Sequence, residues 1–307
     1  MNIFQAIIIG IVQGLTEFIP ISSTAHLIFA SRALGLYEGV ESGLRAEQTT
    51  ATIGVIQLGT LFAVLIYFAP DIWAITNAFV RDHFAALRGG SARPRETRAA
   101  DGSVVPRRRL NLSDDARLGW LIILGSLPVA VFGLAFKEQI EGTFTKNLWV
   151  VATMMIGLAL LLALAEKVGK RQREMKDLGV GDALAVGGAQ VLALIPGASR
   201  SGSTIMGGLF VGQKREAAAR FSFLLSIPAI TASGLLELKE AWSLLPQESF
   251  APLLVGTIVS AFVGYLSIWF LMAFLRKRST AIFIGYRIVL GVIILVLLWQ
   301  GVISPQI

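Results

Sequence analysis

The stretch QGLTEFIPISSTAH, residues 13–26, decides the fold, because it breaks an apolar segment that runs from residue 3 to residue 35. A second break, IPGASRS at residues 195–201, interrupts the apolar segment 180–212. Each half of either segment is shorter than the roughly 20 residues that a helix needs to cross a bilayer. Non-helical backbone at membrane depth is tolerated only where protein buries it or where it lines a cavity. We therefore expect both segments to be re-entrant helix–loop–helix hairpins, each entering and leaving on one side.

Six other stretches are long and apolar enough to cross a bilayer, at 48–69, 117–137, 148–166, 216–237, 252–275 and 282–302. Hydrophobic residues make up 54% of the chain and charged residues only 15%, with a mean hydropathy of +0.69, which excludes an ordinary soluble enzyme. The absence of cysteine excludes disulfides, thiolate catalysis and Cys-ligated metal sites. The expected fold class is an all-α polytopic membrane protein with six transmembrane helices and two re-entrant hairpins.

The basic residues test this topology. With both hairpins re-entrant, one side of the membrane receives 20 Lys and Arg, in 81–117, 167–176, 214–220 and 276–278, and the other side receives five. Such a split is what the positive-inside rule requires, so the first side is cytoplasmic and the first hairpin enters from outside. The net charge of +7 is therefore an orientation signal, and no nucleic-acid partner is needed to explain it.

The two hairpins resemble each other in sequence. GIVQGL at 10–15 matches GGAQVL at 187–192, and each is followed by Ile-Pro and a serine three residues after the proline, Ser23 and Ser199. Inverted repeats with broken helices build many membrane binding sites. We expect one membrane domain, 1–307, with a first half at 1–137 and a second at 180–302. An Arg-rich cytoplasmic insertion at about 82–116 interrupts the first half, and 71–87 is expected at the membrane interface.

Ionisable residues at membrane depth mark function by default. The candidates are Glu17 and His26 in the first hairpin, Arg200 in the second and Arg287 in the last span. Helix starts after each break offer backbone amides and hydroxyls to an anion, phosphate above all, and Arg200 adds a guanidinium that grips phosphate oxygens. The hydroxyl and amide residues around these starts are Gln13, Ser22, Ser23, Thr24, Ser199, Ser201, Ser203 and Thr204. The pattern predicts an anion site between the two hairpins.

Glu17 indicates chemistry beyond binding, because a carboxylate repels phosphate. It fits a general base or a ligand for a divalent cation, with Ser23 as a nucleophile and His26 as an acid or base. The pattern leaves simpler roles open. His26 also fits a structural histidine, Gln57 and Gln190 fit helix packing, and Arg287 fits a structural partner of Glu17 or a cation reaching the membrane surface.

At these residues the sequence resembles the bacterial undecaprenyl-diphosphate phosphatase family, also called bacitracin-resistance proteins. The resemblance rests on Gln13 to His26, on Pro196 to Ser201 with Thr204, and on shorter segments at 55–60, 221–225 and 286–287. It implies an inverted-repeat membrane fold in the bacterial cytoplasmic (inner) membrane, with an active site open to the periplasmic side. The implied reaction converts the C55 isoprenoid diphosphate to its monophosphate, which recycles the lipid carrier of peptidoglycan synthesis and confers bacitracin resistance.

Carried over by position, the resemblance makes Glu17, Ser23, His26 and Arg200 the catalytic residues. Glu17 is the acid/base or metal-linked carboxylate, Ser23 the nucleophile, Arg200 the diphosphate clamp, and His26 an assisting group. Phosphate ligands would be Gln13, Ser22, Ser199, Ser201, Thr204 and Arg287. The family depends on a divalent cation, Mg²⁺ or Ca²⁺, for which Glu17 and Gln13 are the candidate ligands. Many members have Glu where this chain has Gln13, which weakens a two-carboxylate metal mechanism.

Two alternatives stay open at this point. Within the phosphatase, Glu17 activates either Ser23 or a water molecule. The rival class is a transporter or lipid flippase, for which Glu17 would couple to protons. The expected partners are the isoprenoid diphosphate lipid and membrane lipids, and a homodimer is kept as a partner because the sequence does not set the oligomeric state.

Overall fold

The computed structural model describes residues 1–88, 95–98, 104–107, 112–136, 139 and 147–306. Within them, six helices are long and apolar enough to cross a membrane, at the six places that the hydropathy predicts. They are α3 (Ser42–Tyr67), α5 (Asp114–Ala135), α7 (Leu148–Val168), α10 (Arg215–Leu244), α11 (Phe250–Lys277) and α12 (Ala281–Trp299). The prediction of a helical polytopic membrane protein with six spans is confirmed at this level.

Both broken segments form pairs of short helices. The first is α1 (Ile3–Phe18) and α2 (Ser23–Ala33), and the second is α8 (Val180–Val191), a 3₁₀ turn η2 (Leu192–Leu194) and α9 (Arg200–Phe210). A capping box between Asn2 and Gln5 starts α1. The helix ends at Phe18, because Ile19 precedes Pro20 and a residue before proline is driven out of the helical region. The residues ahead of α2 and α9 are serines with positive φ, 76° at Ser22 and 70° at Ser199.

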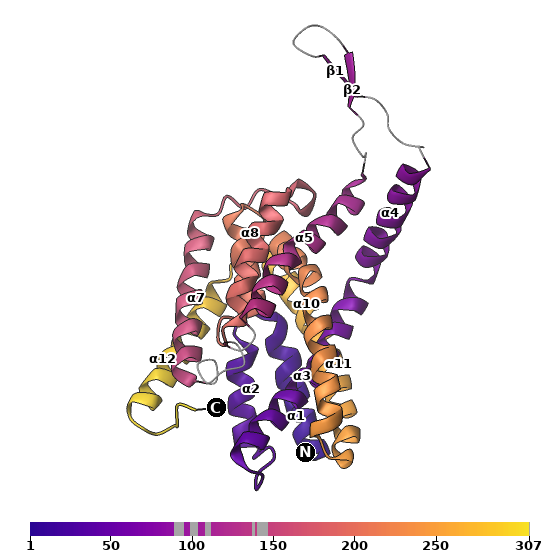
Figure 1. Ribbon diagram of the computed structural model, residues 1–307. Helices are drawn as coiled ribbons and strands as arrows, with labels where there is room; N and C mark the ends of the chain where they lie inside the picture. The colour runs from indigo at the N-terminus through magenta and orange to yellow at the C-terminus, as the bar shows by residue number, and fades with distance from the viewer. Residues whose placement is uncertain (89–94, 99–103, 108–111, 137–138, 140–146, 307) are drawn as a thin grey trace.

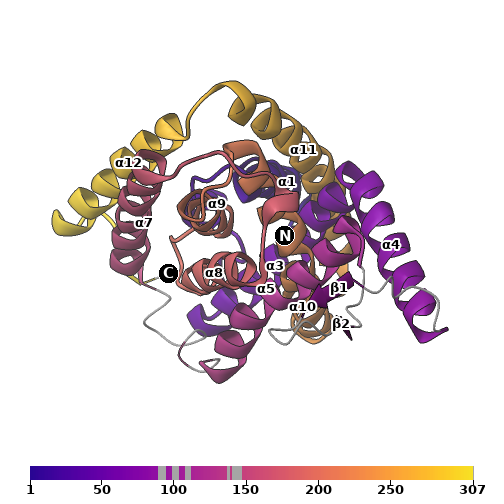
Figure 2. The ribbon, with the colours of Figure 1, turned by 90° about the horizontal axis from the view of Figure 1, so that it is seen from above.

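Helix α9 lies within the bundle, with α7 and α12 on one side of it and α11 on the other (Figures 1 and 2). Helix α1 packs against α11, α8 packs against α5, and α9 contacts α7, α8 and α10. Glycines permit a close helix crossing in each broken segment. A Cβ on Gly10 would lie 2.5 Å from the Gly256 carbonyl oxygen, and one on Gly187 only 2.1 Å from the Gly125 carbonyl oxygen. Small residues of this kind let membrane helices approach closely.

The segment after α3 differs from the expected insertion at about 82–116. Residues 69–87 form a further helix, α4 (Ala69–Leu87), with Pro70 in its first turn, where a proline is tolerated. Helix α5 already begins at Asp114, and a two-stranded hairpin, β1 (Arg95–Arg98) with β2 (Val104–Arg107), lies between them. The insertion is thus shorter than predicted. Figure 1 shows α4 rising obliquely beside α5, which it contacts through Phe79, His83 and Trp120.

Candidate active site

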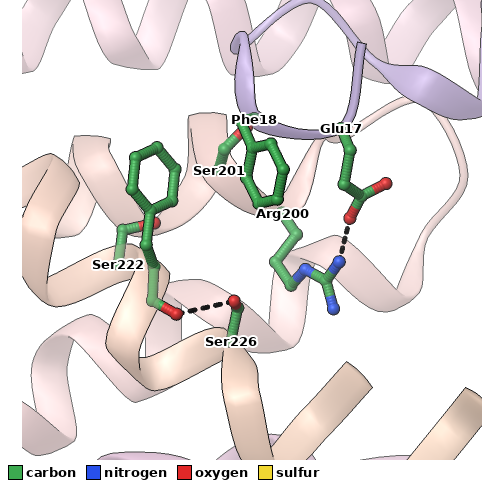
Figure 3. A pocket seen from close by; sticks show the side chains of 7 residues that line it. Glu17, Phe18, Arg200, Ser201, Ser222 and Ser226 are labelled. Atoms are coloured by element: carbon green, nitrogen blue, oxygen red, sulfur yellow. Dashed lines mark hydrogen bonds and ion pairs between the residues drawn. The ribbon is translucent and has the colours of Figure 1, made fainter. Parts of the chain in front are cut away.

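The centre of the site is an ion pair between the two broken segments. Glu17 lies in the last turn of α1 and Arg200 is the first residue of α9. The guanidinium Nη2 of Arg200 donates to Glu17 Oε1 across 183 residues of sequence (Figure 3). The Glu17 side chain is only 5% exposed and the Arg200 side chain 18%, so solvent screens this ion pair far less than it screens a surface pair.

Two glutamines complete the surroundings of the Glu17 carboxylate. Gln13, one turn earlier on α1, donates through Nε2 to Glu17 Oε2 at 2.9 Å, as its i, i+4 spacing predicts. Gln57 on α3 donates to Glu17 Oε1 at 3.3 Å. The sequence suggested only a packing role for Gln57. Its contact shows that three side chains from three helices donate hydrogen bonds to the Glu17 carboxylate and fix its position.

A small pocket opens beside this pair (Figure 3). Its lining joins Glu17 and Arg200 to hydroxyls and aromatic rings, namely Ser201, Ser222, Ser226, Phe18 and Phe223. The Phe18 and Phe223 rings meet edge to face at 5.3 Å between centroids. An apolar wall next to a charged pair excludes water and strengthens the field of the charges. The pocket therefore places the Arg200 guanidinium and the Glu17 carboxylate side by side, next to hydroxyls and an apolar wall.

From the sequence, Ser222 and Ser226 were expected to serve helix packing, as hydroxyls in membrane helices usually do. The signal that could have found them is their i, i+4 spacing on one face of α10. Ser222 is joined to α9 through a hydrogen bond with the hydroxyl of Thr204, which also donates to the Arg200 carbonyl at 2.8 Å. Thr204 thus links α9 to α10 beside the pocket and does not line it.

The start of α9 is shaped for an anion. Ser199 caps the helix, accepting from the Gly202 amide at 3.2 Å and lying 3.3 Å from the Ser201 hydroxyl. Gly197 has φ of +93°, which glycine adopts without strain, and a Cβ there would meet the Val151 carbonyl at 2.2 Å. The glycine at 197 therefore allows the sharp turn that positions the first backbone amides of α9. The dipole of this helix favours negative charge at the same end.

Arg287 stabilises the turn that precedes α9. It is fully buried in α12, and its Nη2 donates to the carbonyls of Ala198 at 2.9 Å and Gly197 at 3.1 Å, while Nε donates to Met155 at 3.1 Å. The structure therefore places Arg287 neither beside Glu17 nor at a helix end near the membrane surface. Its remaining nitrogen, Nη1, has no partner and faces Gly202. Arg287 is the residue that fixes the Pro196–Ser201 turn to α7 and α12.

Replacing Arg287 by methionine is expected to lower the free energy of unfolding by about 3 kcal/mol, because three buried carbonyl oxygens lose their donor. Thermal unfolding of the detergent-purified protein measures this loss. Val289→Met, an exposed position on the same helix, serves as the control and should leave the melting temperature unchanged. An unchanged melting temperature in Arg287→Met would contradict the structural role.

The serines and the histidine of the first break lie apart from this pocket. Ser22 is buried with a hydroxyl that has no partner, Ser23 begins α2 half-buried, and neither lines the pocket. His26 Nδ1 is 2.7 Å from the Ser22 carbonyl, and Nε2 is 2.6 Å from the Tyr286 hydroxyl. A carbonyl only accepts, so Nδ1 carries the proton and Nε2 accepts from Tyr286. The sequence singled out His26 but not its partner Tyr286, which is distant in the chain.

Removing the Tyr286 hydroxyl is expected to lower turnover modestly, by about 10-fold, because His26 loses the donor that fixes its ring and tautomer. The Tyr286→Phe variant keeps the stacked ring, and the measurement is the pH profile of activity beside that of the unaltered protein. The His26→Ala variant should show the same loss of turnover, and adding Tyr286→Phe to it should cause no further loss. Independent, multiplying losses would mean that Tyr286 acts elsewhere.

Glu17 and Gln13 can supply oxygen ligands to a divalent cation. Within the described part of the chain, Gln13 Oε1 is buried without a hydrogen-bond partner, and it belongs to the amide whose Nε2 donates to Glu17. Mg²⁺ and Ca²⁺ take oxygen ligands, and Mg²⁺ commonly uses one or two carboxylates together with substrate phosphates. Within the described residues no three His, Asp or Glu side chains come together. The donor set therefore fits a cation held jointly with a phosphorylated ligand.

These features define a class, a multi-pass helical membrane protein with a buried carboxylate–guanidinium site where two broken helices meet. The family described as bacitracin resistance protein BacA matches residues 6–293. The chain belongs to this family.

Curated relatives cover nearly the whole chain. A protein of Syntrophobacter fumaroxidans is 49% identical over 291 residues, which are 95% of each chain. One of Nocardia farcinica is 45% identical, covering 99% of this chain and 98% of its own, and one of Chlorobium phaeovibrioides is 44% identical, covering 99% and 100%. All three are named undecaprenyl-diphosphatase. The resemblance found in the two motifs is thereby confirmed as family membership.

Proposed function

We propose that the protein hydrolyses undecaprenyl diphosphate to undecaprenyl phosphate and inorganic phosphate. The observation that carries this proposal is the buried pair of Glu17 and Arg200, which sets a base beside an anion-binding group inside a membrane bundle. The names of the curated relatives supply the substrate. An isoprenoid can stay in hydrocarbon while its diphosphate reaches a site at membrane depth, which a soluble phosphate ester would not require.

The arrangement suggests how substrate binding starts the reaction. In the structure Arg200 engages Glu17 Oε1, and a diphosphate offers it oxygens of higher charge in bidentate geometry. As Arg200 turns to the phosphate, the Glu17 carboxylate loses this partner and is released to act as the base. Gln13 and Gln57 keep the carboxylate in place, and the amides at the start of α9 bind the developing charge.

The attacking group is either the Ser23 hydroxyl or a water molecule, the two alternatives that the sequence leaves open. With Ser23, its oxygen bonds to the terminal phosphorus, Glu17 takes the proton, and the bridging P–O bond breaks to release undecaprenyl phosphate. Water then hydrolyses the phosphoserine. With direct attack, Glu17 takes a proton from water and no covalent intermediate forms. Direct attack is favoured by the pocket, because Glu17 and Arg200 line it and Ser23 does not. A phosphoserine trapped on Ser23 would establish the covalent route.

A divalent cation belongs to this proposal, with Glu17 and the free Oε1 of Gln13 as its protein ligands. When bound it would neutralise phosphate oxygens and make the phosphorus easier to attack. Gln13 also orients Glu17, and Ser201, Ser222 and Ser226 can donate to a bound phosphate. Ser22, Ser199 and Arg287 support the two turns that frame the site.

Finer features of the fold belong to the same proposal. We infer two re-entrant hairpins related by an inverted repeat within one domain of 1–307, with halves at 1–137 and 180–302. Gln13 precedes Ser22, and Gln190 precedes Ser199, by the same nine residues, and both serines have positive φ. Gly10 and Gly187 each sit at the closest helix crossing of their hairpin. These matches support Ser22, one residue earlier than the sequence pairing suggested, as the counterpart of Ser199.

The cellular role follows from the reaction. We infer a place in the bacterial inner membrane with the site open to the periplasmic side, recycling the lipid carrier of peptidoglycan synthesis. Removing undecaprenyl diphosphate would also deprive bacitracin of its target and so confer resistance. The charge split supports the orientation. A cysteine-accessibility scan at Glu38 and Lys277, at opposite ends of the bundle, tests it.

The decisive experiment measures inorganic phosphate released from an isoprenoid diphosphate by the purified protein, with and without a chelator. Release that stops with chelator and resumes with Mg²⁺ or Ca²⁺ is expected. A flippase would move its lipid intact, so well-folded protein that releases no phosphate but exchanges lipid between leaflets would replace the phosphatase by a transporter. Mass measurement in detergent tests the predicted homodimer in the same preparation.

A further inference from the structure

Three helix ends meet at Glu166, away from the Glu17 site. Glu166 lies in the last turn of α7 and accepts from Arg215 of α10 through Nε at 2.9 Å and Nη2 at 2.8 Å. It also accepts from the backbone amide and hydroxyl of Thr280, ahead of α12, both at 2.9 Å, and from Arg171 at 3.1 Å. The Glu166 carboxylate thus already accepts from Arg215, Arg171 and Thr280, and among the described residues it does not pair with the other cations nearby.

Four more cations surround this junction. Lys167 and Lys170 follow Glu166, and Lys277 and Arg278 precede Thr280, so the Glu166–Thr280 contact brings the two pairs to one place. All four are exposed, and no carboxylate in the described part of the chain pairs with them. We call these four residues the basic corner. The C-terminal ends of α7 and α11 favour cations through their dipoles, and four exposed cations without a paired carboxylate in the described residues would attract an anionic headgroup at the membrane surface.

The turn that carries the basic corner is held firmly. Arg171 has φ of +52° and folds its side chain back onto the Glu166 carbonyl at 2.8 Å. Gly169 packs so closely on α9 that a Cβ would lie 2.5 Å from the Leu209 carbonyl oxygen. Lys167 and Lys170 therefore project from a fixed backbone, which lowers the entropy lost when they bind a ligand.

Below the basic corner the surface is apolar. Helices α7 and α12 pack against each other at the periphery of the bundle (Figure 2). The exposed apolar side chains include Leu161, Leu164 and Val168 on α7, and Ile282 and Val289 on α12. A ligand here would have its charge at the helix ends and its hydrocarbon along the two helices. Basic pockets between transmembrane helices bind anionic lipid headgroups in this way.

We propose that the basic corner binds the phosphate headgroup of an anionic phospholipid whose acyl chains lie along α7 and α12. This site is separate from the reaction and uses no residue of the Glu17 pocket. A soluble acidic partner would match the charge but would leave the apolar strip beneath it unused. Because Glu166 joins α7, α10 and α12 at this point, a bound lipid would tie the same helix ends together from outside.

The test measures bound phosphatidylglycerol on the full-length protein by native mass spectrometry in nonionic detergent, with phosphatidylcholine as the neutral comparison. The variant K167Q/K170Q/R278Q removes three cations of the basic corner. The matched control R88Q/K176Q/K239Q removes three exposed cations elsewhere, none paired with a carboxylate of the described residues. Neither set touches Glu166 or the candidate active site.

Each basic residue near a lipid surface contributes about 5-fold to affinity, so the first variant is expected to bind phosphatidylglycerol on the order of 100-fold more weakly. The control variant should bind like the unaltered protein. Equal losses in both variants, or equal binding of phosphatidylglycerol and phosphatidylcholine to the unaltered protein, would overturn the proposal. So would full displacement of the lipid by glycerol 3-phosphate in moderate excess, which would identify a free phosphate site instead.

Discussion

Replacing Glu17 by glutamine is expected to reduce phosphate release by about 10³-fold, because positioned general bases contribute factors of 10²–10⁴. Glutamine keeps the size of the side chain and still accepts from Arg200, so the loss measures the charge and basicity of Glu17 and not its packing. Among the described residues that line the pocket, Glu17 is the only carboxylate, and Arg200, Gln13 and Gln57 hold it in place. Initial rates at saturating substrate and cation check the prediction.

Glu38→Gln is the matched control, since Glu38 is an exposed carboxylate and should show an unaltered rate. Thermal unfolding separates chemistry from folding, because Glu17→Gln also leaves Arg200 without its counter-charge. A folded Glu17→Gln protein that keeps more than about a tenth of the activity would remove Glu17 as the base and place the chemistry elsewhere.

The spans could be predicted because hydropathy acts over whole helices. Each of the six expected stretches overlaps an observed span, and the two shorter apolar helices, Ile3–Phe18 and Val180–Leu194, are the first halves of the broken segments. The sequence predicted only a position at the membrane interface for 71–87, and the structure has α4 there, with Pro70 in its first turn, where a proline is tolerated. The strands at 95–98 and 104–107 carry no periodic pattern that would have identified them.

The site was predicted in part. That Glu17 and Arg200 would come near each other followed from two breaks at membrane depth, and the structure brings them into contact. The roles of Gln57 and Arg287 did not follow, because each depends on which face of a distant helix turns inward. A buried arginine can pair with a carboxylate or with backbone carbonyls, and only the packing of α12 on α7 shows that Arg287 does the second.

Arg287 and Arg200 have different partners in the site. Arg287 takes backbone carbonyls and is fully buried, so it cannot leave the turn that it supports. Arg200 is partly exposed to the pocket and holds Glu17 through a side-chain contact that a phosphate can replace. In the proposed reaction, substrate binding therefore coincides with release of the Glu17 carboxylate by Arg200.

Removing that guanidinium is expected to have an effect as large as removing Glu17. Arg200→Ala should lower kcat/KM by about 10³-fold, because an electrostatic donor within a water-poor site contributes 10²–10³ to the rate and the ground-state grip on the diphosphate is lost as well. Arg200→Lys keeps the charge but not the planar pair of donors, so it should recover about a tenth of the lost activity. Steady-state kinetics on the isoprenoid diphosphate measure both variants, with KM expected to rise in each.

The double variant then distinguishes one unit from two independent groups. If Arg200 and Glu17 act by exchanging partners, Glu17→Gln added to Arg200→Ala should cost little more than either change alone, since each already removes the exchange. Losses that multiply to about 10⁶-fold would show that the groups act separately, with Arg200 only a binding residue. Free guanidinium should restore part of the activity of Arg200→Ala and none of Glu17→Gln, because it replaces the missing cation and not the missing base.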